Sequence, residues 1–196
     1  GLELGRGGIS SGSIALHDDG VPLRLAGLGS RRLATLAIQR SAISEGAIVL
    51  VDEIEHGLEP HRVMCSISQL RGDQASAAAQ GKPTGQVLLT THSDVALGEA
   101  GAPSLRVVRT SRPGRITAIV KPGTPDAIHE LMRFAPRALL CRRVLVAEGS
   151  TEVGLLNGVR EHWPAQHGGL PIEHRGAIIA DGNGSQAPDL ALALRG

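Results

Sequence analysis

The sequence predicts an α/β fold built on parallel strands. Three short apolar runs, at residues 47–51, 86–89 and 143–147, each end abruptly in polar residues, and segments with helical periodicity separate them. Continuous runs of Val, Ile and Leu suit parallel strands covered on both faces, and in such sheets ligands bind beyond the carboxyl ends of the strands. We therefore expect the functional residues to follow these strands directly.

Composition is that of an ordinary globular protein. Of 196 residues, 41% are hydrophobic and 20% are charged, close to the average for soluble domains. Aromatic residues are scarce, with only Phe134 and Trp163, which argues against nucleic-acid binding by base stacking. The net charge of +1 neither requires nor excludes a nucleic-acid partner.

Cysteine use and hydropathy predict a reducing, cytoplasmic location. Cys65 and Cys141 lack the spacing of a zinc site, so free thiols are expected. No apolar run approaches the roughly 20 residues needed to cross a bilayer, and no charged-then-apolar leader opens the chain. The Gly- and Ser-rich start, and a helical pattern that still runs at the end, lead us to expect an internal piece of a longer protein.

The remaining elements follow from turn residues and periodicity. We expect a strand at 13–17, a hairpin turn at 18–20, a helix from 33 to 43, a turn at 55–60, a helix from 61 to 70, a loop at 71–85, a hairpin at 104–121, a helical stretch at 125–140 that Pro136 kinks or ends, and a strand, turn and helix from 176 to 194.

The segment before the helix at 33–43 predicts an anion site. Gly27, Gly29 and Ser30 leave backbone N–H groups free at the positive end of the helix dipole. Arg31 and Arg32 follow in the first turn, where cations are unfavourable unless an anion binds. The alternative is an ordinary Gly-Ser cap with solvated arginines.

A pair of carboxylates, Asp52 and Glu53, follows the first strand. One carboxylate can hold Mg²⁺, directly or through water, while its neighbour orients or deprotonates an attacking water. His92 follows the second strand, where it could contact a phosphate or a positioned water. The alternatives are a solvated strand end for the carboxylates and a satisfied polar group for the histidine.

A second pair of carboxylates follows the third strand. Glu148 lies at its end, Gly149 permits a sharp turn, Ser150 or Thr151 can cap the next helix, and Glu152 projects back toward Glu148. Converging carboxylates suit a hard cation such as Mg²⁺ or Mn²⁺. A capping role is the alternative for Glu152, but it does not explain Glu148.

Basic residues without acidic neighbours occupy the predicted hairpin at 104–121. Such a hairpin could meet a DNA backbone electrostatically, or it could present a solvated strand face. Arg142 and Arg143, just before the third strand, are expected near a DNA path.

The order of these elements resembles the second half of an ABC-type ATPase. The Gly-Ser-Arg helix start matches the signature segment, the strand ending in Asp-Glu the Walker B strand, and residues 55–60 the D-loop. The resemblance implies that Asp52 helps to hold Mg²⁺, that Glu53 activates the hydrolytic water, and that His92 senses the γ-phosphate of ATP. It also implies a head-to-tail homodimer. The residues that would contact ATP on the partner subunit are Gly27, Gly29, Ser30 and Arg31.

The second half resembles a Toprim domain, whose first motif is a strand ending in Glu-Gly, here Glu148-Gly149. An ABC ATPase followed by Toprim is the arrangement of the OLD (overcoming lysogenisation defect) nucleases. The segments LGSRRLATLAI, VDEIEHGLEP, LLTTHSDVAL and VAEGSTE resemble that family. The resemblance implies divalent metals held by Glu148 and Glu152, with Asp181 as a further candidate ligand.

Two departures from the family pattern have consequences. No GxxxxGK[ST] phosphate loop occurs in the sequence, so this chain alone should bind ATP poorly. The Asp-x-Asp pair of Toprim is also missing, because Asp181-Gly182-Asn183 precedes the place where that pair belongs. We therefore expect the chain on its own to be inactive.

The sequence thus predicts part of an ATP-dependent, metal-dependent DNA endonuclease. The expected organisation is an ATPase part at residues 1–122, a connector helix at 123–142 and the start of a Toprim nuclease domain at 143–196. The expected cofactors are ATP and Mg²⁺ or Mn²⁺, and the expected partners are DNA and a second copy of the chain, with no membrane. The main alternative is an ATP-switched DNA-binding scaffold of the structural-maintenance type. A topoisomerase- or primase-like Toprim enzyme is disfavoured by the ATPase half.

Overall fold

The computed structural model describes residues 2–4, 14–18, 20–83, 85–110, 114–121 and 125–195. They form a mixed α/β fold, as predicted, in two compact units, Gly1–His92 (unit 1) and Ser93–Gly196 (unit 2). The predicted domains divide at residues 122 and 142, and their assignment to ATPase, connector and nuclease stays a prediction. The predicted turn residues Asp19 and Pro113 lie outside the described residues.

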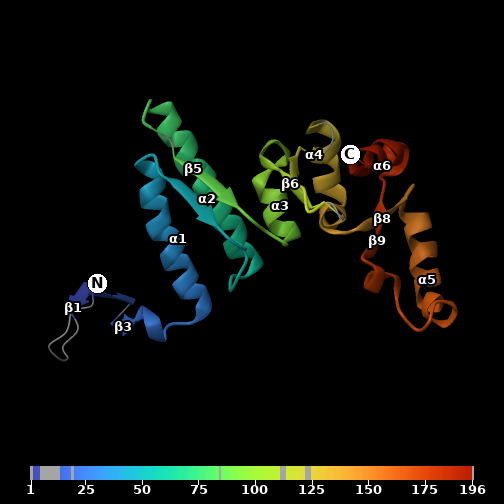
Figure 1. Ribbon diagram of the computed structural model, residues 1–196, viewed down its shortest axis with the longest axis horizontal. Helices are drawn as coiled ribbons and strands as arrows, with labels where there is room; N and C mark the ends of the chain where they lie inside the picture. The colour runs from blue at the N-terminus through green and yellow to red at the C-terminus, as the bar shows by residue number, and fades with distance from the viewer. Residues whose placement is uncertain are drawn as a thin grey trace. The chain divides into compact units, whose positions relative to one another are not determined.

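The described residues of unit 1 form two small sheets and two long helices (Figure 1). Its elements are β1 (Leu2–Leu4), β2 (Ile14–Asp18), β3 (Val21–Pro22), the 3₁₀ turn η1 (Leu23–Leu25), α1 (Leu28–Ser44), β4 (Ile48–Val51), α2 (Pro60–Ala79) and β5 (Gln86–Leu89). The first three strands pair antiparallel, whereas β4 and β5 pair parallel. The predicted hairpin at 13–21 and the two predicted parallel strands are therefore confirmed.

One face of the β4–β5 sheet packs on the helices of unit 1. Val49 and Val51 are buried, together with Val63 and Ile67 of α2. Side chains alternate across a strand, and on the opposite face Ile48 and Leu50 are 67% and 69% exposed. The prediction of a strand covered on both faces is thus wrong, because α1 and α2 cover a single face of this sheet in the described part of the chain.

Helix α2 is longer than the sequence indicates. The small-residue stretch 71–85 predicts a loop, but the helix continues to Ala79. Arg40 of α1 donates from Nε and Nη2 to Asp73 at 2.6 and 3.0 Å, and Gln74 donates to the Gly85 carbonyl at 3.0 Å. These contacts hold the additional turns, and Ala has the highest helix propensity.

Unit 2 combines a basic hairpin, a two-stranded parallel sheet and four helices among its described residues. Its elements are α3 (Asp94–Ala100), η2 (Ala102–Ser104), β6 (Val107–Thr110), β7 (Thr117–Val120), α4 (Pro125–Phe134), η3 (Pro136–Leu140), β8 (Arg143–Ala147), α5 (Ser150–Gln166), η4 (Ile172–Arg175), β9 (Ala177–Asp181), η5 (Gly184–Gln186) and α6 (Ala187–Arg195). β6 and β7 pair antiparallel as the predicted hairpin, whereas β8 and β9 occupy two predicted strands and pair parallel.

The core of unit 2 joins its helices to β9. Its buried residues are Leu97, Ile128, Leu131, Met132, Ala138, Ala180, Leu190 and Ala193. Pro136 separates α4 from η3, as predicted, because proline lacks the N–H that would continue the helix. Asp94 in the first turn of α3 accepts from Arg137 Nε at 2.7 Å, and this bond holds the pKa of Asp94 below its usual value.

Cys65 and Cys141 are free thiols, as expected. None of the helices in the described part of the chain combines the length and apolar character that a bilayer crossing needs.

Candidate functional site

The parallel pairing of β4 and β5 brings two polar segments together at one edge of unit 1. The register places Val51 opposite Leu89, so Asp52 and Thr90 are the next residues on neighbouring strands. Thr90 N–H donates to the Val51 carbonyl at 2.9 Å, and Ile54 N–H donates to the Thr90 carbonyl at 3.1 Å. Ile54 is fully buried, which anchors the chain directly after the carboxylate pair.

The Thr90 hydroxyl fixes the Asp52–Glu53 pair. It donates to Asp52 Oδ1 at 2.6 Å and accepts from Glu53 N–H at 2.8 Å, which uses a hydroxyl both as donor and as acceptor. Both carboxylates remain exposed. Glu53 has a left-handed backbone with φ of 44°, a conformation that costs a non-glycine residue about 1–3 kcal/mol and clusters at functional sites.

Arg32 and His56 hold the backbone around the same pair. Arg32 Nη2 donates to the carbonyl oxygens of Asp52 and Glu53 at 2.5 and 3.0 Å. His56 N–H donates to the Glu53 carbonyl at 2.9 Å, and its Nδ1 lies 3.6 Å from Glu53 Oε2. Arg32 therefore supports the loop of unit 1, whereas the neighbouring Arg31 is exposed.

The predicted anion-binding segment lies against this loop. The sequence predicts Gly29 and Ser30 before the helix. Instead, α1 begins at Leu28 with Gly27 as its N-cap, so Gly29 and Ser30 lie within its first turn. A Cβ on Gly29 would lie 2.8 Å from the Gly57 carbonyl oxygen, closer than real Cβ atoms come. The start of α1 and the turn at Gly57 thus touch backbone to backbone.

Glu55 connects the turn to the segment that carries His92. Its Oε2 accepts from Thr91 Oγ1 at 2.7 Å and its Oε1 accepts from His92 N–H at 2.6 Å. Burial acts to raise the pKa of Glu55, but these hydrogen bonds together outweigh it, and the pKa lies below its ordinary value. The His92 side chain is exposed beside this anchored backbone.

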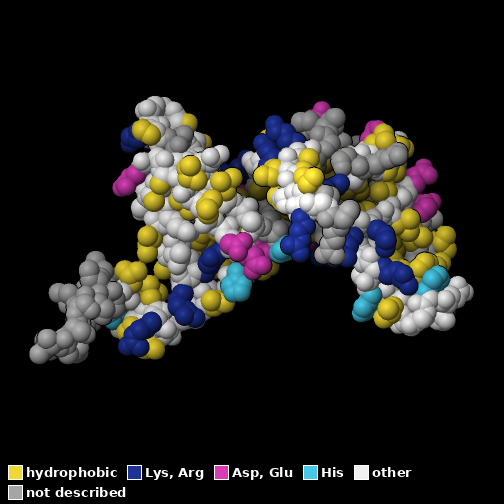
Figure 2. All heavy atoms as spheres, viewed as in Figure 1, with side chains coloured by type: hydrophobic (Ala, Val, Ile, Leu, Met, Phe, Trp, Pro, Cys, Tyr) yellow, Lys and Arg dark blue, Asp and Glu magenta, His cyan; other side chains and the backbone are white. Residues whose placement is uncertain are grey.

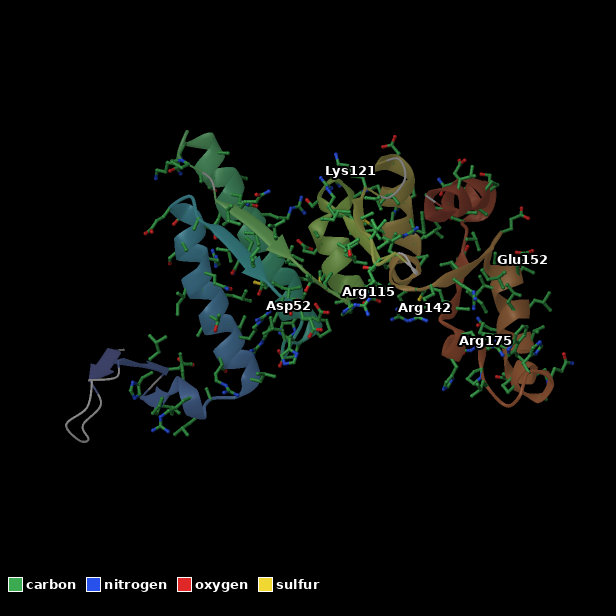
Figure 3. The ribbon with its side chains drawn as sticks, viewed as in Figure 1. Asp52, Arg115, Lys121, Arg142, Glu152 and Arg175 are labelled. Carbon is green, nitrogen blue, oxygen red and sulfur yellow. The ribbon has the colours of Figure 1, made fainter. Side chains whose placement is uncertain are left out.

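Unit 1 thus brings Asp52, Glu53 and His92 to one edge, joined through Thr90 and Glu55 (Figure 3, where Asp52 is labelled). Sequence reasoning missed Thr90 and Glu55 as members of the site. The parallel register of the two strands is the signal that would have indicated Thr90, because it places the residue after Leu89 beside the residue after Val51.

A family model described as "AAA domain, putative AbiEii toxin, Type IV TA system" matches residues 12–98. These residues are similar to an AAA-type ATPase domain. The ATPase-like segment includes every residue of the edge described above, and its similarity is consistent with ATP hydrolysis. No curated protein matches the chain. The expected relation to OLD nucleases and to Toprim domains stays a prediction.

Outside the ATPase-like segment, unit 2 has a second strand edge with carboxylates. β8 and β9 pair in parallel with Ala147 opposite Asp181, so Glu148 and Asp181 lie at neighbouring strand ends. Gly182 N–H donates to the Ala147 carbonyl at 2.8 Å, and Gly184 N–H donates to the Glu148 carbonyl at 2.6 Å. The Glu148 side chain is exposed.

Glu152 is engaged by the helix start. Its Oε2 accepts from Gly149 N–H at 3.1 Å, and Gly149 is the N-cap of α5, so the expected cap by Ser150 or Thr151 is wrong. Gly149 has an extended backbone and no side chain that could cap the helix. The Glu152 carboxylate supplies the acceptor for the Gly149 N–H, as the glutamate of a capping box does. Asp181 Oδ1 accepts from Asn183 N–H at 2.9 Å. Among the residues that the structure describes, no three His, Cys, Asp or Glu side chains gather as a metal site.

Proposed function

We propose that the protein hydrolyses ATP at the carboxyl edge of β4 and β5. The observation that carries this proposal is the Thr90 hydroxyl, which holds Asp52 and Glu53 side by side within the ATPase-like segment. Asp52 keeps one carboxylate oxygen that Thr90 does not engage, and hard oxygen ligands suit Mg²⁺. Mg²⁺, when bound, would neutralise charge on the phosphates.

The remaining roles belong to side chains of unit 1. Glu53 orients and deprotonates the attacking water, and its exposed carboxylate leaves room for that water. His92 contacts the γ-phosphate, with its backbone held by Glu55. Gly27, Gly29, Ser30 and Arg31 contact ATP on a second copy of the chain, which makes the active form a homodimer. The backbone contact of Gly29 with the Gly57 turn supports this role, because it sets the helix start close to the strand edge.

The test is ATP hydrolysis by the full-length protein with Glu53→Gln. Loss of a general base typically lowers kcat by about 10²–10⁴-fold, while binding of ATP should persist. The dimer should therefore accumulate with ATP, which light scattering would detect. Glu45→Gln is the matched control, because Glu45 is an exposed carboxylate at the far end of α1. Hydrolysis by Glu53→Gln at the wild-type rate would refute the assignment.

The second strand edge supports a finer proposal, in which the ATPase controls a metal-dependent DNA endonuclease of the OLD type. Glu148 and Asp181 lie at neighbouring strand ends, and carboxylates so placed can hold Mg²⁺ or Mn²⁺, with Glu152 as a further ligand. A divalent metal held there would supply an activated water for phosphodiester cleavage. The test is plasmid nicking by the full-length protein and by Glu148→Ala, with DNA binding measured for both.

One observation favours the alternative, an ATP-switched DNA-binding scaffold. Glu152 is occupied by the Gly149 N–H, which leaves fewer carboxylate oxygens for a metal. The scaffold predicts ATP-dependent DNA binding with no strand scission by the wild type. Scission that disappears in Glu148→Ala would instead assign the chemistry to the β8–β9 edge.

A further inference from the structure

Three arginines gather at the amino end of the β8–β9 sheet, opposite the edge that carries Glu148. Arg142 N–H and Arg143 N–H both donate to the Gly176 carbonyl, at 3.1 and 3.0 Å. Gly176 directly follows Arg175, so the three arginines meet at one point of the backbone. Figure 3 shows Arg142 and Arg175 near the lower margin of unit 2, with Glu152 higher in the view.

The local backbone brings these three residues together. Gly176 has a left-handed φ of 68°, and a Cβ there would lie 3.2 Å from Arg142 Cβ and Cδ, so the stem of Arg142 lies across the glycine. Arg143 Nη1 donates to the Arg175 carbonyl at 3.4 Å. The cluster is therefore built by the pairing of the two strands and is not a chance meeting of long side chains.

Among the described residues, no acidic side chain pairs with the cluster. All three side chains are exposed, and none forms an ion pair with any residue that the structure describes. The acidic residue nearest in sequence, Glu173, is bound to Arg160 Nε at 2.5 Å. Neighbouring cations repel each other, so an anion that binds all three relieves this repulsion. Basic side chains also line this part of unit 2 in the space-filling view (Figure 2).

We infer that Arg142, Arg143 and Arg175 bind successive phosphates of a nucleic-acid backbone. Guanidinium groups suit phosphate oxygens because they donate in a planar fork. The three side chains are exposed, whereas sites for free nucleotides are concave and enclose most of the ligand. A continuous polyanion therefore fits the surface better than a free phosphate does.

The position of the cluster also sets a spacing, a step that rests on the proposed cleavage at Glu148. Arg143 begins β8 and Glu148 follows its last residue, so five steps of about 3.3 Å, or roughly 17 Å, separate the two residues. Phosphates of one strand advance about 3.4 Å per base pair. Contacted phosphates should thus lie roughly five base pairs from the cut.

The closing experiment measures binding of a duplex of about 25 base pairs by the full-length protein, in EDTA and without nucleotide. Under these conditions it is independent of ATP hydrolysis and of cleavage. Arg142→Gln, Arg143→Gln and Arg175→Gln combined should weaken binding roughly tenfold to a hundredfold, and should reduce the slope of log K against log salt by about 2–3. The triple substitution to Lys keeps the charge and should stay within a few fold of the wild type.

The matched control removes the same charge from unit 1, at three exposed cations outside the predicted hairpin, with Arg24→Gln, Arg71→Gln and Lys82→Gln combined. An equal loss in this control would show a general charge effect and would overturn the inference. Failure of the wild type to bind DNA would overturn it too, as would binding of inorganic triphosphate, but not DNA, through the cluster. Circular dichroism must show that every variant is folded.

Discussion

At the scale of single residues, Thr90 positions the carboxylate pair of the ATPase-like edge. One hydroxyl binds the side chain of Asp52 and the backbone N–H of Glu53, and Glu53 has a left-handed backbone. The net contribution of one hydrogen bond to the free energy of unfolding is about 0.5–1.5 kcal/mol. Misplacement of a catalytic group by a small distance can lower the reaction rate by a larger factor. Thr90 should therefore matter more for turnover than for folding.

Thr90→Val tests this expectation, since valine keeps the shape and removes the hydroxyl. We expect a loss of about 1–2 kcal/mol in the free energy of unfolding and a fall in kcat for ATP of roughly tenfold or more, with a small change in KM. Thr117→Val is the control, because its hydroxyl bonds Thr110 on the hairpin and not a residue of the ATPase-like edge. A stability loss without an effect on kcat would show that Thr90 is merely structural.

Glu55 gives unit 1 a pH dependence of known sign. Its pKa in the folded protein lies below the ordinary value of 4.5, so the folded state favours the ionised form. This contribution to stability is complete above the unfolded pKa and is lost as the pH falls through the lower folded value. The difference in unfolding free energy between wild type and Glu55→Gln should therefore shrink below about pH 4.5. Urea titrations at several pH values would measure it, and a constant difference would contradict the assignment.

At the scale of elements, the sequence predicted the strands and most helix positions, because apolar runs and turn residues are local. The contact of Thr90 with Asp52 joins residues 38 positions apart and depends on the register between β4 and β5, which no local pattern encodes. The extension of α2 depends likewise on Arg40 reaching Asp73 from another helix. The N-cap of α5 is Gly149 and not Ser150 or Thr151, whereas the acceptance by Glu152 from the Gly149 N–H is the capping role that the sequence had left as an alternative.

The contact between α1 and the Gly57 turn leaves no room for a side chain at Gly29. Gly29→Ala would place a Cβ 2.8 Å from a backbone oxygen that cannot move without shifting the turn, so we expect a loss of about 1–3 kcal/mol and a lower kcat. Gly72→Ala is the control, since that position within α2 is open. It should raise stability by about 0.5–1 kcal/mol. Thermal unfolding of both variants measures the contrast, and equal effects would exclude the close approach.

At the scale of the whole molecule, unit 2 has a buried core built from its own residues. Leu131 is 1% exposed in unit 2 and Leu155 is 68% exposed on α5. Leu131→Ala should destabilise unit 2 by about 2–5 kcal/mol, and Leu155→Ala should change stability by less than about 0.5 kcal/mol. Hydrogen exchange should show faster opening of unit 2 with unit 1 unchanged. Faster exchange in both units would mean that they unfold as one.

The uncovered face of β4 and β5 has a consequence for handling the protein. Ile48, Leu50 and Leu88 are all more than half exposed on this sheet. Contiguous apolar surfaces of different molecules associate in water, and unpaired strand edges offer backbone N–H and C=O groups to a strand of another molecule. The folded protein should therefore aggregate under conditions in which it does not yet unfold. Turbidity should rise with protein concentration and with added sulfate, and Leu50→Lys should lower it.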